Sequence, residues 1–90
     1  MKGLCISLIL FAFTLRPGFA QVSKIHDLQR SLTTIRDSAR YVDVLNRISL
    51  LFYEQDADST LFYALQARRI AFRQDYRQGL ADATNNLGVV

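Results

Sequence analysis

The sequence predicts an all-α fold in which antiparallel helix pairs stack as a solenoid. Apolar residues recur every three or four positions after residue 20, and no alternating run of apolar and polar residues is long enough for a strand. The segment VDVLNRIS at 42–49 also returns 39 residues later as ADATNNLG at 81–88, with its Asp and first Asn unchanged. Self-similarity at a period of roughly 20 to 50 residues is typical of stacked repeat units.

The start of the chain has the composition of a secretory signal peptide. Lys2 precedes an apolar run from Leu4 to Leu15, and Pro17 and Gly18 end that run shortly before Ala20. The run is too short to span a bilayer, so we expect cleavage after Ala20. A buried core helix and an uncleaved anchor are the alternatives. Export predicts a periplasmic location, with membrane contact only through this segment or a span further downstream.

The composition after the signal excludes several classes of protein. Without Lys2 and Arg16, nine basic residues face eight acidic ones. Proteins that bind nucleic acid concentrate basic residues on one face, so this balance argues against that partner. The only cysteine, Cys5, lies within the signal, and the only histidine, His26, has no cluster of metal-binding residues around it. The sequence therefore indicates no catalytic residue, no metal and no cofactor.

Four helices are expected after the cleavage site, at about 23–35, 38–53, 60–74 and 80–90. Ser23 is the expected N-cap of the first helix, and Asp58 or Ser59 that of the third, because their side chains accept hydrogen bonds from unpaired amides. Gly79 is expected in the last turn, where it tolerates backbone angles that cost other residues more.

The third of these helices combines small and large apolar residues. Its alanines at three- and four-residue spacing, Ala64, Ala67 and Ala71, allow a neighbouring helix to approach closely. We expect the larger residues beside them to fill the grooves: Leu61, Leu65 and Ile70. We expect the aromatic residues to pack in the core and between repeats: Tyr41, Phe52, Tyr53, Phe62, Tyr63, Phe72 and Tyr76.

The predicted organisation has four parts: a signal peptide at 1–20, a leading or capping helix at 21–37, a first helix pair at 38–78, and the first helix of the next repeat at 79–90. About 70 residues without disulfides or metal are few for an independent core. The last helix also stops with its apolar face unfinished. We therefore expect the chain to be the front of a longer solenoid, with further repeats downstream.

The helix pairs resemble tetratricopeptide repeats over residues 38–90. The residues that carry the resemblance are Leu45, Ile48, Ser49 and Phe52 on the first helix, Thr60, Ala64 and Ala67 on the second, and Leu87 and Gly88 in the next repeat. Ser49 stands where the family usually has glycine, Thr60 replaces a usual alanine, and no proline ends the second helix. The period exceeds the typical 34 residues of the family, which is similar to the long-helix variety of exported bacterial sensors.

The resemblance implies a module that binds a protein or peptide in a concave groove, lined by the first helix of each pair. The matching positions are Asp43, Asn46, Arg47, Leu50, Tyr53 and Glu54, followed by Asp82, Asn85, Asn86 and Val89. A ladder of Asn side chains can hydrogen-bond the backbone of an extended ligand, because each amide both donates and accepts. On this hypothesis Asn46→Ala and Asn85→Ala weaken binding without unfolding the protein. The alternative is an ordinary solvated polar face.

Four arginines near the end of the third helix raise the question of a second binding site, one for an anion. Arg69, Arg73 and Arg77 are four residues apart, and Arg68 lies beside them. They are either an anion site or a solvated face that complements the negative carboxyl end of the helix, and we favour the second interpretation.

A signal peptide followed by long-period repeats looks like the periplasmic sensory region of a bacterial membrane signalling protein, such as a two-component sensor kinase or a transcriptional regulator. These residues carry no kinase motif, so any catalysis would belong to a domain further downstream. A free periplasmic scaffold protein and a helical accessory domain of an enzyme are the alternatives.

Overall fold

The computed structural model describes residues 17–88, which form four α-helices joined by short turns. Their bounds are α2 Pro17–Ser31, α3 Ser38–Phe52, α4 Ala57–Arg73 and α5 Arg77–Gly88. No strand occurs in this range, so the predicted all-α class is confirmed for the residues described. Residues 1–16 of the predicted signal peptide lie outside them, as does Val89 of the predicted groove.

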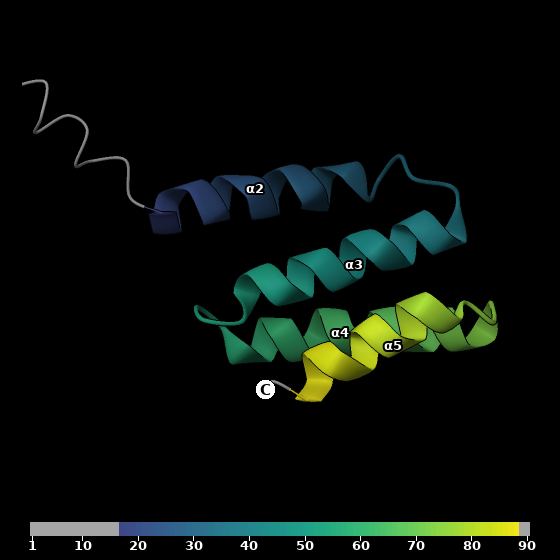
Figure 1. Ribbon diagram of the computed structural model, residues 1–90. Coiled ribbons are helices and arrows are strands. Elements are labelled where there is room, and N and C mark those ends of the chain that lie inside the picture. Colours follow the sequence, from purple (N-terminus) through teal and green to yellow (C-terminus); the bar gives the residue numbers. More distant parts are fainter. Residues whose placement is uncertain (1–16, 89–90) are drawn as a thin grey trace, which may run out of the picture.

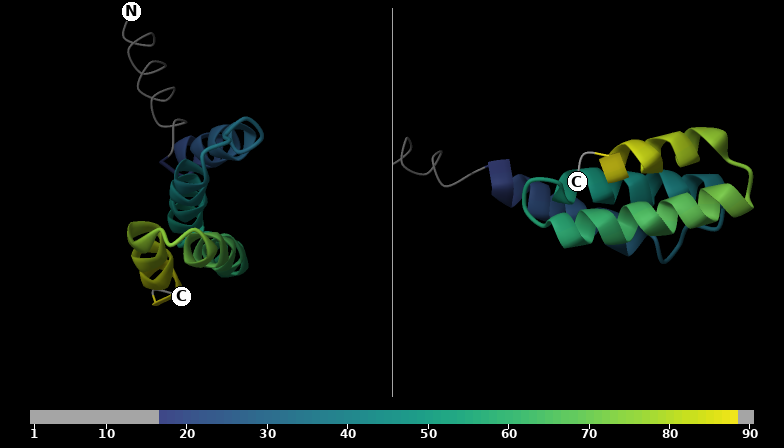
Figure 2. Two further views of the ribbon diagram at one scale, coloured as in Figure 1. Left: turned by 90° about the vertical axis from the view of Figure 1, so that its right-hand side faces the viewer. Right: turned by 90° about the horizontal axis from the view of Figure 1, so that it is seen from below.

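Successive helices run in opposite directions, so α5 runs alongside α3 in the same direction (Figure 1). The end-on view shows α3, α4 and α5 as a three-helix group, with α2 on the far side of α3 (Figure 2). Contacts join α3 with α4, α4 with α5, and α3 with α5, whereas α2 packs mainly on α3. This arrangement places α3 and α5 next to each other although α4 separates them in the sequence.

The core lies where α3, α4 and α5 meet. It is built from Val42 and Leu45 on α3, Ala67 and Ala71 on α4, and Ala83 on α5, all fully buried. Alanine side chains are small enough for the axes of α4 and its neighbours to come close, while Leu45 fills the space between them. The predicted close approach along the alanine row of α4 is confirmed.

The larger apolar residues of α4 only partly follow the prediction. Ile70 and Tyr63 are half-buried and pack against the core, as expected. Leu61, Leu65, Phe62 and Phe72 are exposed, and the prediction that they pack inside was wrong. These four residues lie on a different side of α4 from the row of Ala64, Ala67 and Ala71, so their side chains point away from the core.

Small polar residues are buried where α3 crosses α4. The Ser49 hydroxyl donates a 2.7 Å hydrogen bond to the Thr60 carbonyl oxygen, and the Thr60 hydroxyl donates to the Asp56 carbonyl oxygen at 3.3 Å. Ser49 and Thr60 are completely buried, yet within residues 17–88 no buried side-chain nitrogen or oxygen lacks a partner. The two buried hydroxyls are therefore satisfied where the helices cross.

Helix α4 begins three residues earlier than predicted. Asp56 is its N-cap, and its carboxylate accepts hydrogen bonds from the Ser59 hydroxyl at 2.7 Å and the Ser59 amide at 3.3 Å. Asp58 therefore lies within the first turn, and the expectation that Asp58 or Ser59 caps the helix was wrong. The bonds from Ser59 stabilise the charged carboxylate and hold the pKa of Asp56 below its ordinary value.

The turn between α4 and α5 does not use Gly79. Asp75 is the residue with a positive φ, 53°, and it follows the last turn of α4. The Tyr76 amide donates a hydrogen bond to the Ala71 carbonyl oxygen at 2.8 Å, and the Asp75 amide donates one to the Phe72 carbonyl oxygen at 3.3 Å. These two bonds form a Schellman motif, in which Asp tolerates a conformation that usually requires glycine. Gly79 instead lies inside α5.

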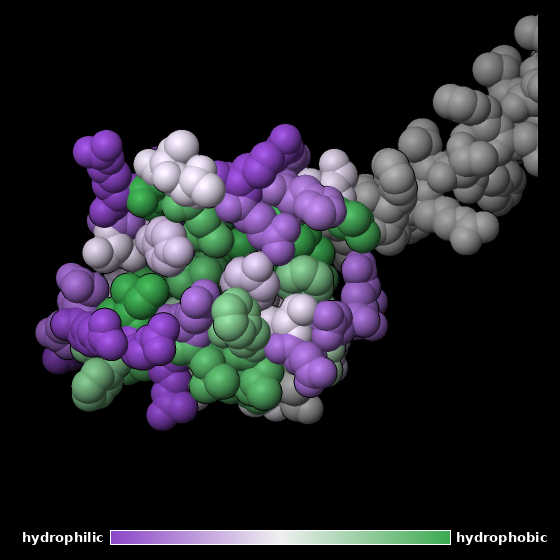
Figure 3. All heavy atoms as spheres, turned by 180° about the vertical axis from the view of Figure 1, so that it is seen from behind, coloured by the Kyte–Doolittle hydropathy of each residue, from purple (hydrophilic) through white to green (hydrophobic). Residues whose placement is uncertain are grey.

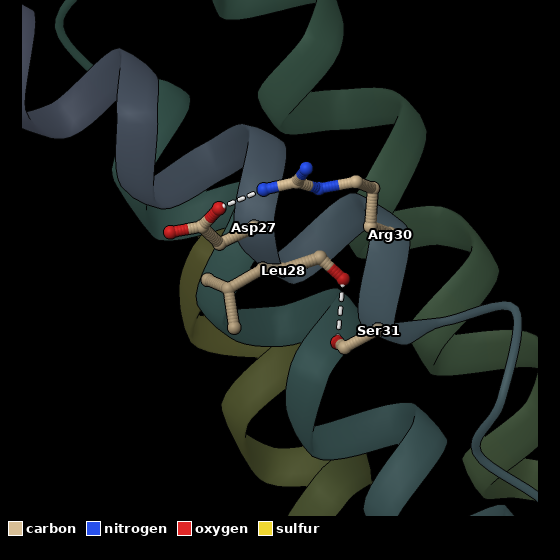
Figure 4. Close-up of polar contacts among 4 residues, drawn as sticks. All are labelled: Asp27, Leu28, Arg30 and Ser31. Carbon is tan, nitrogen blue, oxygen red and sulfur yellow. Dashed lines mark hydrogen bonds and ion pairs between the residues drawn. The ribbon is translucent and has the colours of Figure 1, made fainter.

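Helix α2 is shifted towards the start of the chain relative to the prediction. It begins at Pro17 rather than Ser23, because the fixed φ of proline suits a first helical position. It ends at Ser31, whose hydroxyl donates to the Leu28 carbonyl oxygen at 2.6 Å, and an ion pair joins Asp27 to Arg30 in the same turn (Figure 4). Gln29 donates a 2.9 Å hydrogen bond to the Tyr63 hydroxyl and ties α2 to α4.

Candidate functional site

A groove of about 500 Å³ lies between α3 and α5. Side chains from three segments line it: Asp43, Asn46, Arg47 and Leu50 from α3, Tyr76 from the preceding turn, and Gln78, Asp82, Asn85 and Asn86 from α5. Seven of the ten residues predicted for the concave surface are among them. The parallel course of α3 and α5 explains this, because equivalent positions of the two helices then face the same space.

Two predicted residues lie away from the groove. Tyr53 and Glu54 are exposed at the carboxyl end of α3 and do not line it. Two lining residues were missed, Tyr76 and Gln78. A signal for Gln78 existed, since it stands one helical turn before Asp82, whereas the position of Tyr76 depends on the turn at Asp75.

The floor of the groove is a hydrogen-bonded pair of asparagines. The Asn46 side-chain amide donates to the Gly79 carbonyl oxygen at 3.1 Å. The Asn86 side-chain amide donates to the backbone oxygen of Asn46 at 3.0 Å and approaches its side-chain oxygen at 3.4 Å. Asn46 is 6% exposed and Asn86 8%. Both side chains hold α3 against α5.

This arrangement corrects the expected ladder of free asparagines. The side-chain nitrogens of Asn46 and Asn86 already donate hydrogen bonds between α3 and α5. Of the three asparagines in the predicted groove, Asn85 alone is exposed to solvent. The repeated Asp-x-x-Asn pattern thus places one of its asparagines in a structural role. The sequence could not distinguish these roles because they depend on the distance between two helices that are not adjacent in the chain.

Gly79 sets how closely α5 approaches α3. A Cβ atom at this position would lie 2.6 Å from Val42 Cγ1 and 2.6 Å from the Tyr76 ring, closer than real contacts allow. The absence of a side chain lets the Gly79 carbonyl reach Asn46, so the glycine acts through packing rather than through unusual backbone angles.

The charges along the groove are unevenly distributed. Asp43 accepts a 2.7 Å hydrogen bond from the Tyr76 hydroxyl, and Asp82 accepts a 3.0 Å bond from Gln78. The bond to Asp43 raises the pKa of Tyr76 because it stabilises the protonated phenol, and the negative charges of Asp43 and Asp82 add to this shift. The end of the groove near the α4–α5 turn is therefore acidic.

The other end of the groove is cationic and then apolar. Arg47 follows Asp43 by one helical turn, is exposed, and makes no ion pair within residues 17–88. Leu50 follows after another turn and is 58% exposed. Asn85 on α5 faces the same groove. Charged, amide and apolar groups therefore follow one another along this one surface.

Within residues 17–88, no three side chains of His, Cys, Asp or Glu come together as a metal site. None of the helices described is both long and apolar enough to cross a bilayer. In comparisons with known proteins, no protein family, curated protein or solved structure matched the chain.

We expect Asn46→Ala and Asn85→Ala to differ in their effect on stability. The first removes a buried hydrogen bond and leaves Asn86 without its side-chain contact, which costs about 1 to 3 kcal/mol of the free energy of unfolding. Asn85 is exposed, so its substitution changes stability by less than about 0.5 kcal/mol. Urea denaturation followed by circular dichroism measures both. Equal effects would show that the pair between α3 and α5 does not hold the helices together.

Proposed function

We propose that this chain is a protein- or peptide-interaction module of the tetratricopeptide type, and that the groove between α3 and α5 binds an extended peptide segment. On this proposal α3 and α4 form one helix pair and α5 opens the next. The observation that carries it is the placement of Arg47, Leu50 and Asn85, three exposed side chains of different chemistry, around one groove.

The fixed floor of the groove supports a binding role. Asn46, Asn86 and Gly79 lock the separation of α3 and α5 through buried hydrogen bonds. A surface that is already ordered loses less conformational entropy on binding, so more of the contact energy contributes to affinity.

The lining residues favour a ligand of particular chemistry. The Asn85 amide can donate to and accept from a peptide backbone. Leu50 offers an apolar contact, Arg47 a cation, and Asp43 and Asp82 an acidic end. We therefore expect an extended segment with a basic residue opposite Asp43 and Asp82. An apolar residue of the segment would lie about 11 Å further along, opposite Leu50, because Leu50 follows Asp43 by about two helical turns.

Selection of a random peptide library on the full chain tests this proposal. Enriched peptides are then measured by calorimetry against the wild type and the groove variant Arg47→Glu/Leu50→Ala/Asn85→Ala. We expect binding to weaken at least about tenfold, a loss of about 1.4 kcal/mol. All three positions are exposed, so the variant should keep its helical circular dichroism.

The control variant is Val22→Ala/Lys24→Glu, which makes the same kinds of change on the exposed surface of α2. It should bind the selected peptides as the wild type does. Equal affinity of the groove variant and the wild type would overturn the proposal, as would a library without enrichment over a selection lacking the protein.

The exported setting and the sensory role in a membrane signalling protein stay proposals from the sequence, beside the alternative of a free periplasmic scaffold. The exported setting rests on the first 20 residues, most of which lie outside the part of the chain that the structure describes. The sensory role rests on these residues together with the 39-residue period.

A further inference from the structure

The outward face of α4 carries large apolar side chains. Leu61, Phe62, Leu65 and Phe72 are exposed, Leu65 by 46% and Phe72 by 76%. They are spaced so that they share one side of the helix. Seen from behind, the surface of the molecule shows apolar atoms among hydrophilic ones (Figure 3).

This distribution inverts the usual pattern of an amphipathic helix. On α3 the large side chains Leu45 and Ile48 are buried, whereas on α4 the buried row consists of alanines and a threonine. The leucines and phenylalanines of α4 therefore contribute little to the core of the chain itself. Clustered exposed apolar residues of this size mark interaction surfaces.

Opposite charges flank this apolar row, because Asp58 precedes Leu61 and Arg73 follows Phe72, whereas Arg68 and Arg69 lie within the row. Asp58 is exposed in the first turn of α4, and Glu54 is exposed in the preceding loop. Arg68, Arg69 and Arg73 are exposed in the second half of the helix, and none of them forms an ion pair within residues 17–88. Arg77, which the sequence grouped with them, instead begins α5.

We infer that the outward face of α4 is a self-association surface, and that two copies of this chain pair through antiparallel α4 helices. A two-fold axis near Leu65, the middle of the helix, brings the Asp58 end of one copy opposite the Arg73 end of the other. It also brings the two Leu65 side chains together and places Phe62 opposite Arg68, where a cation can stack on the ring. A face with an apolar centre and opposite charges at its ends is complementary to itself under such an axis.

The charge pattern selects the antiparallel arrangement and a second copy as the occupant. A parallel pair would set Asp58 against Asp58 and Arg73 against Arg73, which is unfavourable. The inference is independent of the proposed groove, because α4 presents this face away from α3 and α5.

Sedimentation velocity on the full chain over a range of concentrations tests the inference. We expect a reversible dimer in the wild type and at least about tenfold weaker association in Leu65→Glu, which places two like charges on the axis. Leu50→Glu is the matched control, since it makes the same change at an exposed leucine of α3 and should leave the dimer intact.

A charge exchange distinguishes this pairing from unspecific association. Asp58→Arg and Arg73→Asp should each weaken the dimer, and the double variant should restore it, because antiparallel pairing again sets opposite charges together. A wild-type monomer at all concentrations would overturn the inference, as would a dimer that Leu65→Glu leaves unchanged. Binding of the wild-type monomer to anionic lipid vesicles, lost in Leu65→Glu, would assign the face to a membrane instead.

Discussion

Leu45→Ala is expected to lower the free energy of unfolding by about 2 to 5 kcal/mol, the range for removing a buried leucine side chain. Leu45 is completely buried where α3, α4 and α5 meet, and its neighbours Ala67, Ala71 and Ala83 are too small to fill the space it would leave. The total stability of a small domain is about 5 to 15 kcal/mol, so this one change removes a large share. Urea denaturation followed by circular dichroism measures the loss.

Leu50→Ala provides the control on the same helix. Leu50 is exposed and lines the groove, so the same truncation should change the free energy of unfolding by less than about 0.5 kcal/mol. Comparable losses at Leu45 and Leu50 would mean that α3 does not present Leu45 to the core.

Gly79→Ala is expected to destabilise the chain although alanine favours helices. Inside a helix, alanine is preferred over glycine by about 1 kcal/mol. The added methyl group, however, would lie 2.6 Å from Val42 Cγ1 and from the Tyr76 ring. Overpacking of this kind costs about 1 to 3 kcal/mol, so the balance is a net loss of stability. The hydrogen bond from Asn46 to the Gly79 carbonyl should weaken as α5 moves away from α3.

Gly88→Ala is the matched control, because a Cβ atom at this glycine of the same helix meets nothing within 4 Å. It should leave stability unchanged or raise it slightly, as helix propensity predicts. The two substitutions are compared by their thermal midpoints. A gain of stability in both variants would contradict the close approach of α3 and α5 at Gly79.

The parts of the fold that follow from local patterns could be predicted from the sequence. The apolar spacing of α3 predicted both ends of that helix to within one residue. The alanine row of α4 predicted that this helix packs closely against its neighbours. Helix ends were less accurate because several residues compete for one role. Asp56, Asp58 and Ser59 are all residue types that favour the N-cap position. The structure shows that Asp56 takes this position, because its side chain accepts a hydrogen bond from the Ser59 amide.

The candidate site was predictable where the two helices repeat one another. Equivalent positions such as Asp43 and Asp82 do face one groove. The roles of Asn46 and Asn86 could not be read from the pattern, since their burial depends on how closely Gly79 lets α5 approach. The exposed leucines of α4 were missed for a similar reason, because helical spacing alone does not say which stripe faces a neighbour.

Binding of a peptide in the groove between α3 and α5 can be observed by a nuclear magnetic resonance titration of the full chain with a selected peptide. We predict that the side-chain signals of Asn85 and Arg47 and the methyl signals of Leu50 shift as the peptide binds. The signals of Leu61 and Leu65 on the outward face of α4 should stay in place. Shifts confined to that face or to α2, with Asn85 and Leu50 unchanged, would mean that the peptide does not bind in the groove.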